Sequence, residues 1–288
     1  MSKTFPTLGL IADGPTAQMY ISPASSLGIQ LLHLSSQDAA HSNLQNCDVV
    51  TLADQSNSLI IAKKLQADGI TVRPSFSALS FSAHKFNSKF DQDSTICVMV
   101  ARSPHGQATT WAPTQILRSN GTWIMSITPA PRLSDELQEK AQQLALDFSA
   151  SAAAVGVIAI EMSIKDDELI IVNVQMYPDA SGNWTVDGSI TSQYEQHLRA
   201  VLDLPLGDPS MSSKFVVTGN FYCGAKPNMY RPYLHLMART PALKFHQYKN
   251  SQVQGELMGH ITIAGDDLPQ LIEEIEHALD YLQAEIDE

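Results

Sequence analysis

Short apolar runs alternate with helical patterns along the first third of the chain, and this alternation constrains the fold most strongly. Strand-like runs lie at residues 7–12, within 26–35 and at 47–53. A helix is predicted over 58–69, where Gly69 suits a C-terminal stop, and residues 70–75 return to an extended conformation. Because strands separated by helices usually pair in parallel, this part predicts a doubly wound, mostly parallel α/β sheet.

Hairpins replace the strand–helix alternation in the second third. A buried strand that begins near Ile96 is followed by a turn at Pro104–Gly106 and a second strand. Residues 133–151 form a predicted helix with Ser134 as its N-cap, and two apolar runs within 155–174 flank the turn KDD. These features predict α+β structure with antiparallel strands.

The last third begins with a helix predicted over 191–202, where Ser192 stands three residues before Glu195 in the spacing of a capping box. The remaining apolar segments are 214–222, 235–240 and 259–265, followed by an acidic amphipathic helix at 268–285. A polar junction at 83–95 separates the two folding styles. We therefore expect three domains: a doubly wound domain at 1–93, an α+β domain at 94–207 and a small mixed β domain at 208–288.

The charge balance argues against a polyanionic partner. Lys and Arg number 18 against 30 Asp and Glu, a formal net charge of −12, and no basic cluster offsets it. This disfavours nucleic acid and anionic membranes, although a pocket with a few local donors can still bind an anionic small molecule. No apolar run approaches the roughly 18 residues of a membrane span, no signal-peptide pattern is present, and the three cysteines lack CxxC spacing. We expect a cytosolic protein without structural zinc.

Glu161 is the strongest candidate for chemistry because it interrupts the apolar strand VIAIEMSI. A carboxylate in such a strand must be solvated, paired or coordinated to a metal ion, since burying it alone is costly. The facing strand offers Asn173 and Gln175, which are polar and neutral, so one carboxylate supplies half a magnesium site at best. An edge-exposed glutamate without a ligand is the alternative.

Other motifs indicate less chemistry. The loop after the 155–174 hairpin carries only Tyr177 and Asp179 as ionisable groups up to Trp184. The turn GLIADGPTAQM lacks the glycine spacing of a phosphate-binding loop, so a plain strand-to-helix turn is favoured. No G-x-S-x-G elbow is present. Three histidines are too far apart in sequence to define a metal site: His197, His246 and His260.

Several segments resemble one known family, in the same order along nearly the whole chain. The stretch NWTVDGSITSQYEQHLRAVLDLPLGD at 183–208 resembles the ATP-dependent 5-(carboxyamino)imidazole ribonucleotide synthetases, ATP-grasp enzymes of purine biosynthesis that carboxylate aminoimidazole ribonucleotide. Further similar segments are CDVVTL, GITVRPSFSALSFSAHKFNSKF, ICVMVARSPHGQ, APRLSDELQEKAQQLA, VGVIAIEMSI and LMGHITIAG. The resemblance implies a pre-ATP-grasp domain, the catalytic half of an ATP-grasp domain and a small C-terminal domain. It also implies ATP and magnesium as cofactors, a ribonucleotide substrate and a homodimer.

The sequence departs from this family at several parts of the expected site. The glycine-rich N-terminal turn becomes ADGPTAQM, in which Met19 is kept. Between Lys89 and Ile96 a few residues replace the lid subdomain and its nucleotide-gripping lysine. The family's Asn-Glu pair, which carries the second metal glutamate, becomes Asn173–Val174. The loop Arg-Pro-His-Asn-Ser-Gly-His becomes YPDASGNW, without the arginine and both histidines.

Carried over residue by residue, the resemblance implies a reduced site. Glu161 matches the first metal glutamate and would act in catalysis with Asn173, while Ser181, Gly182 and Lys249 would bind substrate. Because several parts of one mechanism are lost together, the main hypothesis is a non-catalytic homologue that acts as a binding or regulatory protein. The alternatives are an active ligase with a reduced site or a lid from another chain, and a fold retained only as an interaction surface.

Overall fold

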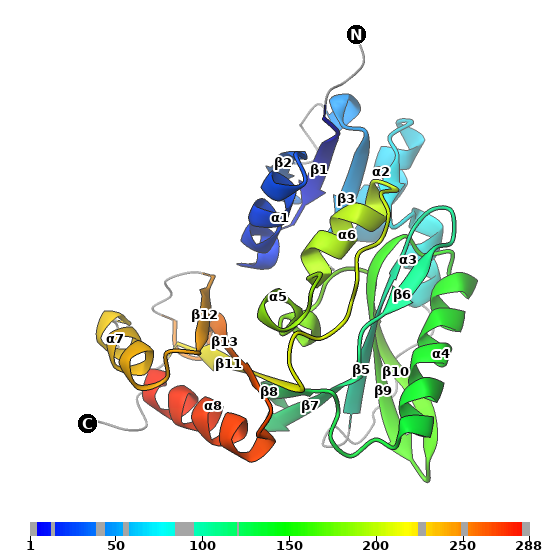
Figure 1. Cartoon of the computed structure of the whole chain (residues 1–288). Coiled ribbons are helices and arrows are strands. Elements are labelled where there is room, and N and C mark those ends of the chain that lie inside the picture. Colours follow the sequence, from blue (N-terminus) through cyan, green and yellow to red (C-terminus); the bar gives the residue numbers. More distant parts are fainter. Residues whose placement is uncertain are drawn as a thin grey trace.

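The computed structural model describes residues 5–12, 15–38, 44–53, 58–83, 95–119, 121–223, 229–248 and 253–283. These residues form a small parallel sheet and a large antiparallel sheet, with helices packed on both (Figure 1). The predicted combination of an α/β part with an α+β part is therefore confirmed. Residues 84–94 of the predicted junction lie outside the described residues, and so does Lys249.

The small sheet has four parallel strands in the order β2-β1-β3-β4. Its strands are β1 Thr7–Ile11, β2 Gln30–Leu34, β3 Val49–Leu52 and β4 Val72–Arg73. The helices of this part are η1 Pro15–Tyr20, α1 Ile21–Ser26, η3 Leu44–Asn46, α2 Ser58–Ala67 and α3 Phe76–Ala83. Gly69 follows α2 with a φ of +78°, and the Ile70 N–H donates to the Leu65 carbonyl. This is the predicted glycine stop, in the form of a Schellman turn.

The large sheet has nine strands in antiparallel pairs, in the order β10-β9-β5-β7-β8-β11-β13-β12, with β6 paired to β5. The strands are β5 Thr95–Arg102, β6 Ala108–Thr110, β7 Thr114–Ser119, β8 Thr122–Thr128, β9 Gly156–Lys165, β10 Glu168–Gln175, β11 Phe215–Tyr222, β12 Lys244–Gln247 and β13 Leu257–Gly265. The predicted 155–174 hairpin is β9–β10. Asp166 and Asp167 form its turn with φ values of 51° and 61°, the left-handed pair that a tight hairpin turn requires.

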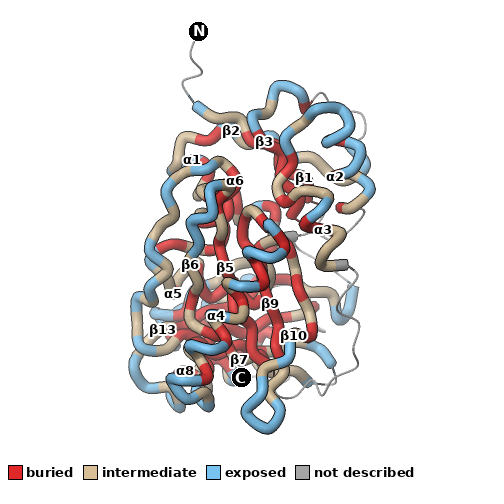
Figure 2. The backbone as a smooth tube through the Cα atoms, turned by 90° about the vertical axis from the view of Figure 1, so that its right-hand side faces the viewer, coloured by how far each residue is buried: buried red, intermediate tan, exposed pale blue. Residues whose placement is uncertain are grey.

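Strands from the predicted domains 94–207 and 208–288 share this sheet, because β11 pairs with β8. Two helices bury their apolar faces on it, α4 Asp135–Ser151 against β5 and α8 Leu268–Leu282 against β11. Figure 2 shows the buried residues concentrated along the strands. The predicted segment 235–240 is mostly helical, since it belongs to α7 Tyr230–Arg239. The domain boundaries themselves stay a prediction.

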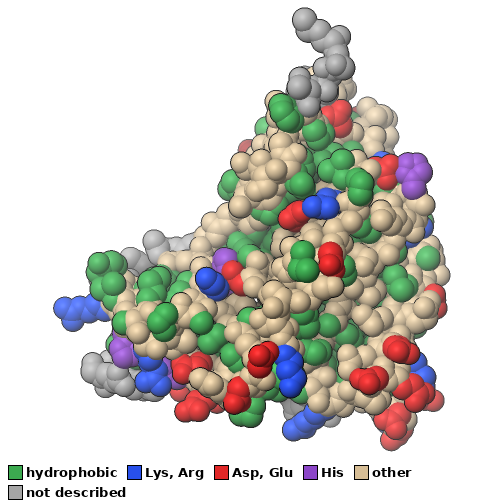
Figure 3. All heavy atoms as spheres, viewed as in Figure 1, with side chains coloured by type: hydrophobic (Ala, Val, Ile, Leu, Met, Phe, Trp, Pro, Cys, Tyr) green, Lys and Arg blue, Asp and Glu red, His purple; other side chains and the backbone are tan. Residues whose placement is uncertain are grey.

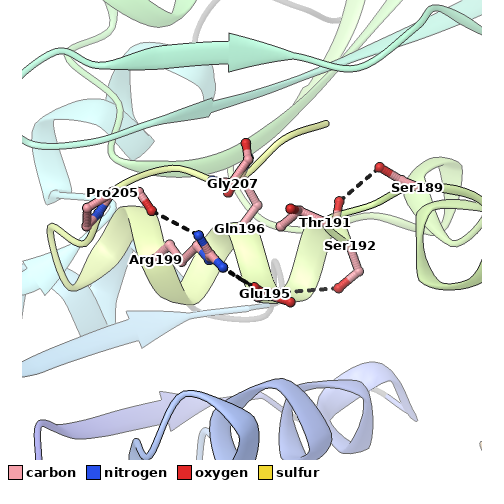
Figure 4. A network of polar contacts seen from close by, with 8 residues as sticks. All are labelled: Ser189, Thr191, Ser192, Glu195, Gln196, Arg199, Pro205 and Gly207. Atoms are coloured by element: carbon pink, nitrogen blue, oxygen red, sulfur yellow. Dashed lines mark hydrogen bonds and ion pairs between the residues drawn. The ribbon is translucent and has the colours of Figure 1, made fainter. Parts of the chain in front are cut away.

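The segment that carries the strongest family resemblance is held together by its own polar groups (Figure 4). It contains α5 Thr185–Gly188 and α6 Gln193–Val201. Ser192 caps α6 through a hydrogen bond from the Glu195 N–H, as predicted, while the Glu195 carboxylate pairs with Arg199 at 2.6 Å. The Gln196 side chain binds both the N–H and the carbonyl of Gly207, at 2.7 and 2.8 Å. These contacts fold the following chain back along the helix.

Helix α6 also joins the two sheets. Its residues Tyr194, Leu198 and Val201 pack into a buried cluster with β1, β3 and α1, and its opposite side contacts β9 (Figure 1). His197 reaches both sheets by hydrogen bonds to Thr51 and Val157, at 2.8 and 3.1 Å. The relative placement of the two sheets therefore rests on a helix that lies within the resembling segment.

Candidate functional site

One row of side chains crosses three neighbouring strands of the large sheet. Cys97 on β5, Glu161 on β9 and Asn173 on β10 are register partners, so their side chains share one face. Asn173 and Gln175 lie on the strand that faces Glu161, as predicted, and a register irregularity between Ile171 and Asn173 places Asn173 directly opposite it. Gln175 lies further along β10, opposite Ala159. Asn173 is half-buried, and Glu161 is 8% exposed.

Glu161 is paired with an arginine. Nη2 of Arg118 donates to Oε1 of Glu161 at 2.5 Å, and Nη1 donates to the Thr95 hydroxyl at 2.6 Å. The two charged side chains are 13% and 11% exposed. The guanidinium also lies 5.9 Å from the Trp123 ring centre, within reach of a cation–π interaction. Among the three possibilities for this carboxylate, the structure selects the paired one.

Sequence reasoning did not find Arg118. Its only local signal is its charge inside the strand-like segment TQILRS. A charged residue in such a segment is equally typical of a solvent-exposed strand face. The contact depends on β7 pairing beside β5, whose other neighbour is β9. The guanidinium thus crosses two strand spacings to reach Glu161, which no local pattern specifies.

The loop after β10 lies against this row. Ser181 accepts a hydrogen bond from the Cys97 thiol at 3.1 Å, and its own N–H and hydroxyl both donate to Oδ2 of Asp179, at 3.1 and 2.9 Å. Burial raises the pKa of Asp179, with Glu161 adding to this and the Ser181 hydrogen bonds opposing it. Burial also raises the pKa of the Cys97 thiol, so the thiol stays protonated. Ser181, predicted to bind substrate, is buried in this network.

Gly182, the other predicted substrate-binding residue of the loop, lies buried between Met99 and Gln193. A Cβ added there would overlap the Met99 sulfur and Oε1 of Gln193, and that oxygen accepts the Asp179 N–H at 3.1 Å. We expect Gly182→Ala to lower the free energy of unfolding by about 1–3 kcal/mol, measured by urea denaturation. An unchanged midpoint would show that Met99 and Gln193 move aside without loss.

Two adjoining hollows lie at a different place, between the small sheet and the C-terminal part. They measure about 660 and 380 Å³ and share five lining residues: Gln18, Met19, Ser22, Ser26 and His246. The surface is visibly hollowed between the lobe of the small sheet and the lobe of α7 and α8 (Figure 3). The Gln18 side chain donates to the Gln247 carbonyl at 2.9 Å and so links η1 to β12 across this cleft. We call the two hollows the α1–β12 cleft.

A chain of polar groups begins at His246, which lines the α1–β12 cleft. His246 binds Asp187 of α5 at 2.7 Å and stacks on His260 with ring centres 4.5 Å apart. Nδ1 of His260 accepts from the Tyr248 hydroxyl at 2.5 Å, and Tyr248 accepts from Asn183 at 2.8 Å. Burial, then the neighbouring His246, lowers the pKa of His260, so its ring is neutral. The two histidines, separate in sequence, meet because β12 pairs with β13 in register.

The described residues do not fit a magnesium ion at Glu161. Oε1 of its carboxylate already accepts from Arg118, so an ion bound by this group would lie beside a like charge, and the facing Asn173 is neutral. Within the described ranges, no group of three His, Cys, Asp or Glu side chains is arranged to hold a metal ion. None of the helices in those ranges is long and apolar enough to cross a membrane.

Comparisons with known proteins agree with this architecture. The profile of the ATP-grasp domain matches residues 86–194. The N5-carboxyaminoimidazole ribonucleotide synthase of Mycobacterium tuberculosis (strain ATCC 25618 / H37Rv) is 36% identical over 233 residues, which cover 80% of this chain and 52% of that protein. The chain belongs to this family of ATP-grasp proteins. The synthase of Bacillus subtilis (strain 168) is 32% identical over 186 residues, or 62% of this chain and 46% of that protein. The chain thus spans about half the length of the curated relatives it matches.

Solved structures with low sequence identity share the fold of this N5-carboxyaminoimidazole ribonucleotide synthase homologue. The synthase of Aspergillus clavatus, in complex with ADP and 5-aminoimidazole ribonucleotide, has a TM-score of 0.85 at 19% identity, over 97% of this chain and 99% of that chain. The synthetase of Thermus thermophilus has a TM-score of 0.81 at 19% identity, over 98% of this chain and 99% of that chain. The predicted fold class and family resemblance are confirmed.

Proposed function

We propose that this homologue is a non-catalytic binding protein that holds a ribonucleotide related to aminoimidazole ribonucleotide in the α1–β12 cleft. The observation that carries the proposal is the cleft itself. It is lined by Met19, kept from the family's N-terminal turn, by Ile190 and Ser192 of the resembling segment, and by His246 of β12. Its volume lies in the range of small-ligand sites. The relative of known structure from Aspergillus clavatus is described in complex with that ribonucleotide.

The part of the chain that would bind ATP supports the proposed loss of catalysis. Only the short segment 84–94 connects α3 to β5, where the family resemblance implies a nucleotide-covering lid. Phosphoryl transfer needs enclosed phosphates and fixed positive charge around them. Glu161, the one carried-over metal ligand, is paired with Arg118. Ser181 and Gly182 then support the loop rather than act on substrate, and Asn173 is a neutral neighbour of the Arg118–Glu161 pair. The family resemblance assigns Lys249, outside the described residues, to the ribonucleotide phosphate.

The active ligase remains the second candidate, because the ATP-grasp profile matches residues 86–194. It would need ATP, magnesium and a lid from elsewhere, for example from another chain. The homodimer that the family resemblance implies and the cytosolic location expected from the sequence form part of the same proposal. Under the third reading, the fold serves only as an interaction surface.

The first test is isothermal titration calorimetry with aminoimidazole ribonucleotide and, separately, with magnesium–ATP. We expect heat of binding from the ribonucleotide and none from ATP. Ser22→Trp should abolish ribonucleotide binding, since Ser22 is an exposed lining residue of both hollows and tolerates a large side chain. Ser151→Trp, at the exposed end of α4, is the matched control. ATP consumption that requires the ribonucleotide would establish the active ligase instead. If neither compound gives heat of binding, the third hypothesis, a fold that serves only as an interaction surface, would be favoured.

A further inference from the structure

The position of Arg118 has a consequence that is independent of the α1–β12 cleft. Its side chain is fixed on three sides, by the Glu161 carboxylate, the Thr95 hydroxyl and the Trp123 ring. Two of these groups belong to the strands that flank it in the sheet order, β5 and β8. Its two hydrogen bonds and its aromatic contact all favour the same side-chain conformation, so Arg118 has little freedom to move away from the carboxylate.

We propose that the Arg118 guanidinium is the resident cation of the Glu161 carboxylate and excludes a divalent metal ion from it. A magnesium or manganese ion must approach a carboxylate oxygen to about 2.0–2.2 Å, and the guanidinium already occupies Oε1. An ion placed beside it would meet a like charge at short range. Displacing Arg118 instead would leave a nearly buried guanidinium without its counter-ion.

The neighbouring groups do not compensate for an added double charge. Asn173 and the Cys97 thiol, which lie in register with Glu161, contribute no negative charge. Asp179 is held by the N–H and the hydroxyl of Ser181. The positive charge of Arg118 and the negative charge of Glu161 already neutralise each other, so a divalent ion would add uncompensated positive charge. Glu161, which the family resemblance implies as a metal ligand, thus holds an arginine in place of the ion.

The test uses Mn²⁺ and the full chain, with binding followed by loss of the free-ion electron paramagnetic resonance signal. At Mn²⁺ concentrations on the order of 1 mM, wild type and Glu161→Gln should bind the same background amount. Arg118→Gln should gain one bound ion, about 10-fold above that background in affinity. The double variant Arg118→Gln/Glu161→Gln should return to background, which assigns the gained ion to Glu161.

Two results would overturn the proposal. One is a Mn²⁺ ion bound by wild type and lost in Glu161→Gln, which would mean that Arg118 moves aside. The other is a folded Arg118→Gln that gains no ion. Should Arg118→Gln fail to fold, the comparison of wild type with Glu161→Gln decides alone. None of these readings depends on ribonucleotide binding, so a failure here is distinct from a failure of the proposed function.

Discussion

Acid should destabilise this protein through His197, with the free energy of unfolding falling by about 1.4 kcal/mol per pH unit below pH 6.5. Burial lowers the pKa of His197 from 6.5 to about 3. Between these values the folded state keeps the ring neutral while the unfolded chain binds a proton, so stability rises with pH. The contribution is present in full above pH 6.5, and on the order of 4–5 kcal/mol is lost by pH 3.

The geometry explains why His197 resists protonation. Nδ1 accepts from the Val157 N–H, and the Nε2 hydrogen donates to Thr51, whose own hydroxyl hydrogen goes to the Arg73 carbonyl. A second ring proton would point at the Val157 N–H. The same ring bridges β3 of the small sheet and β9 of the large one, so protonation would disrupt a hydrogen-bonded contact between the two sheets.

Urea denaturation at a series of pH values from about 4 to 8 would measure this slope in wild type and in His197→Gln. We expect the variant to lose about 1–3 kcal/mol at pH 8, through unmatched hydrogen bonds, and to show a shallower slope below pH 6.5. His260 is also buried and neutral, so wild type and variant share its contribution. His105→Gln, which removes a histidine that is 83% exposed and lies 2.6 Å from Asp203, is the control for losing a histidine outside the core. Parallel curves for wild type and His197→Gln would contradict the assignment.

Local signals in the sequence were sufficient wherever the structure is decided by neighbours along the chain. Ser134 caps α4 and Gly69 ends α2, because caps and stops depend on a few consecutive residues. The β9–β10 hairpin and its turn were equally predictable, but its register at Glu161 was not: a regular continuation from the turn would put Val172 opposite Glu161, and the irregularity between Ile171 and Asn173 puts Asn173 there.

The remaining features depend on pairing between distant strands. Arg118 reaches Glu161 only because β7 pairs with β5, and His246 meets His260 only through the β12–β13 register. The α1–β12 cleft likewise needs η1 and β12, more than two hundred residues apart, to come together through Gln18 and Gln247. No periodicity or motif encodes such contacts. The family resemblance indicated which segments matter, but it did not supply the arginine.

Removing one partner of the Arg118–Glu161 pair should cost about 3–5 kcal/mol of unfolding free energy, the second large effect we expect. Glu161→Ala leaves a guanidinium that is 13% exposed without its counter-ion, and Arg118→Ala leaves the carboxylate in the same state. The double replacement Arg118→Met/Glu161→Leu removes both charges and keeps the volume. It should be neutral within about 1 kcal/mol or more stable than wild type, because buried ion pairs recover little beyond their desolvation cost.

Urea denaturation of wild type, the singles and the Met/Leu double measures this difference. The exposed pair Glu136–Lys140 on α4, also joined by one short contact of 2.7 Å, is the matched control and should show no measurable coupling. Because the Met/Leu pair would serve folding as well as the charges do, its stability would show that Arg118 and Glu161 are not kept for stability. Their charges would then be explained by the site they occupy, where the arginine replaces a metal ion. If the single variants lose little unfolding free energy, Arg118 instead leaves Glu161 readily. Glu161 would then be better described as a metal-binding glutamate.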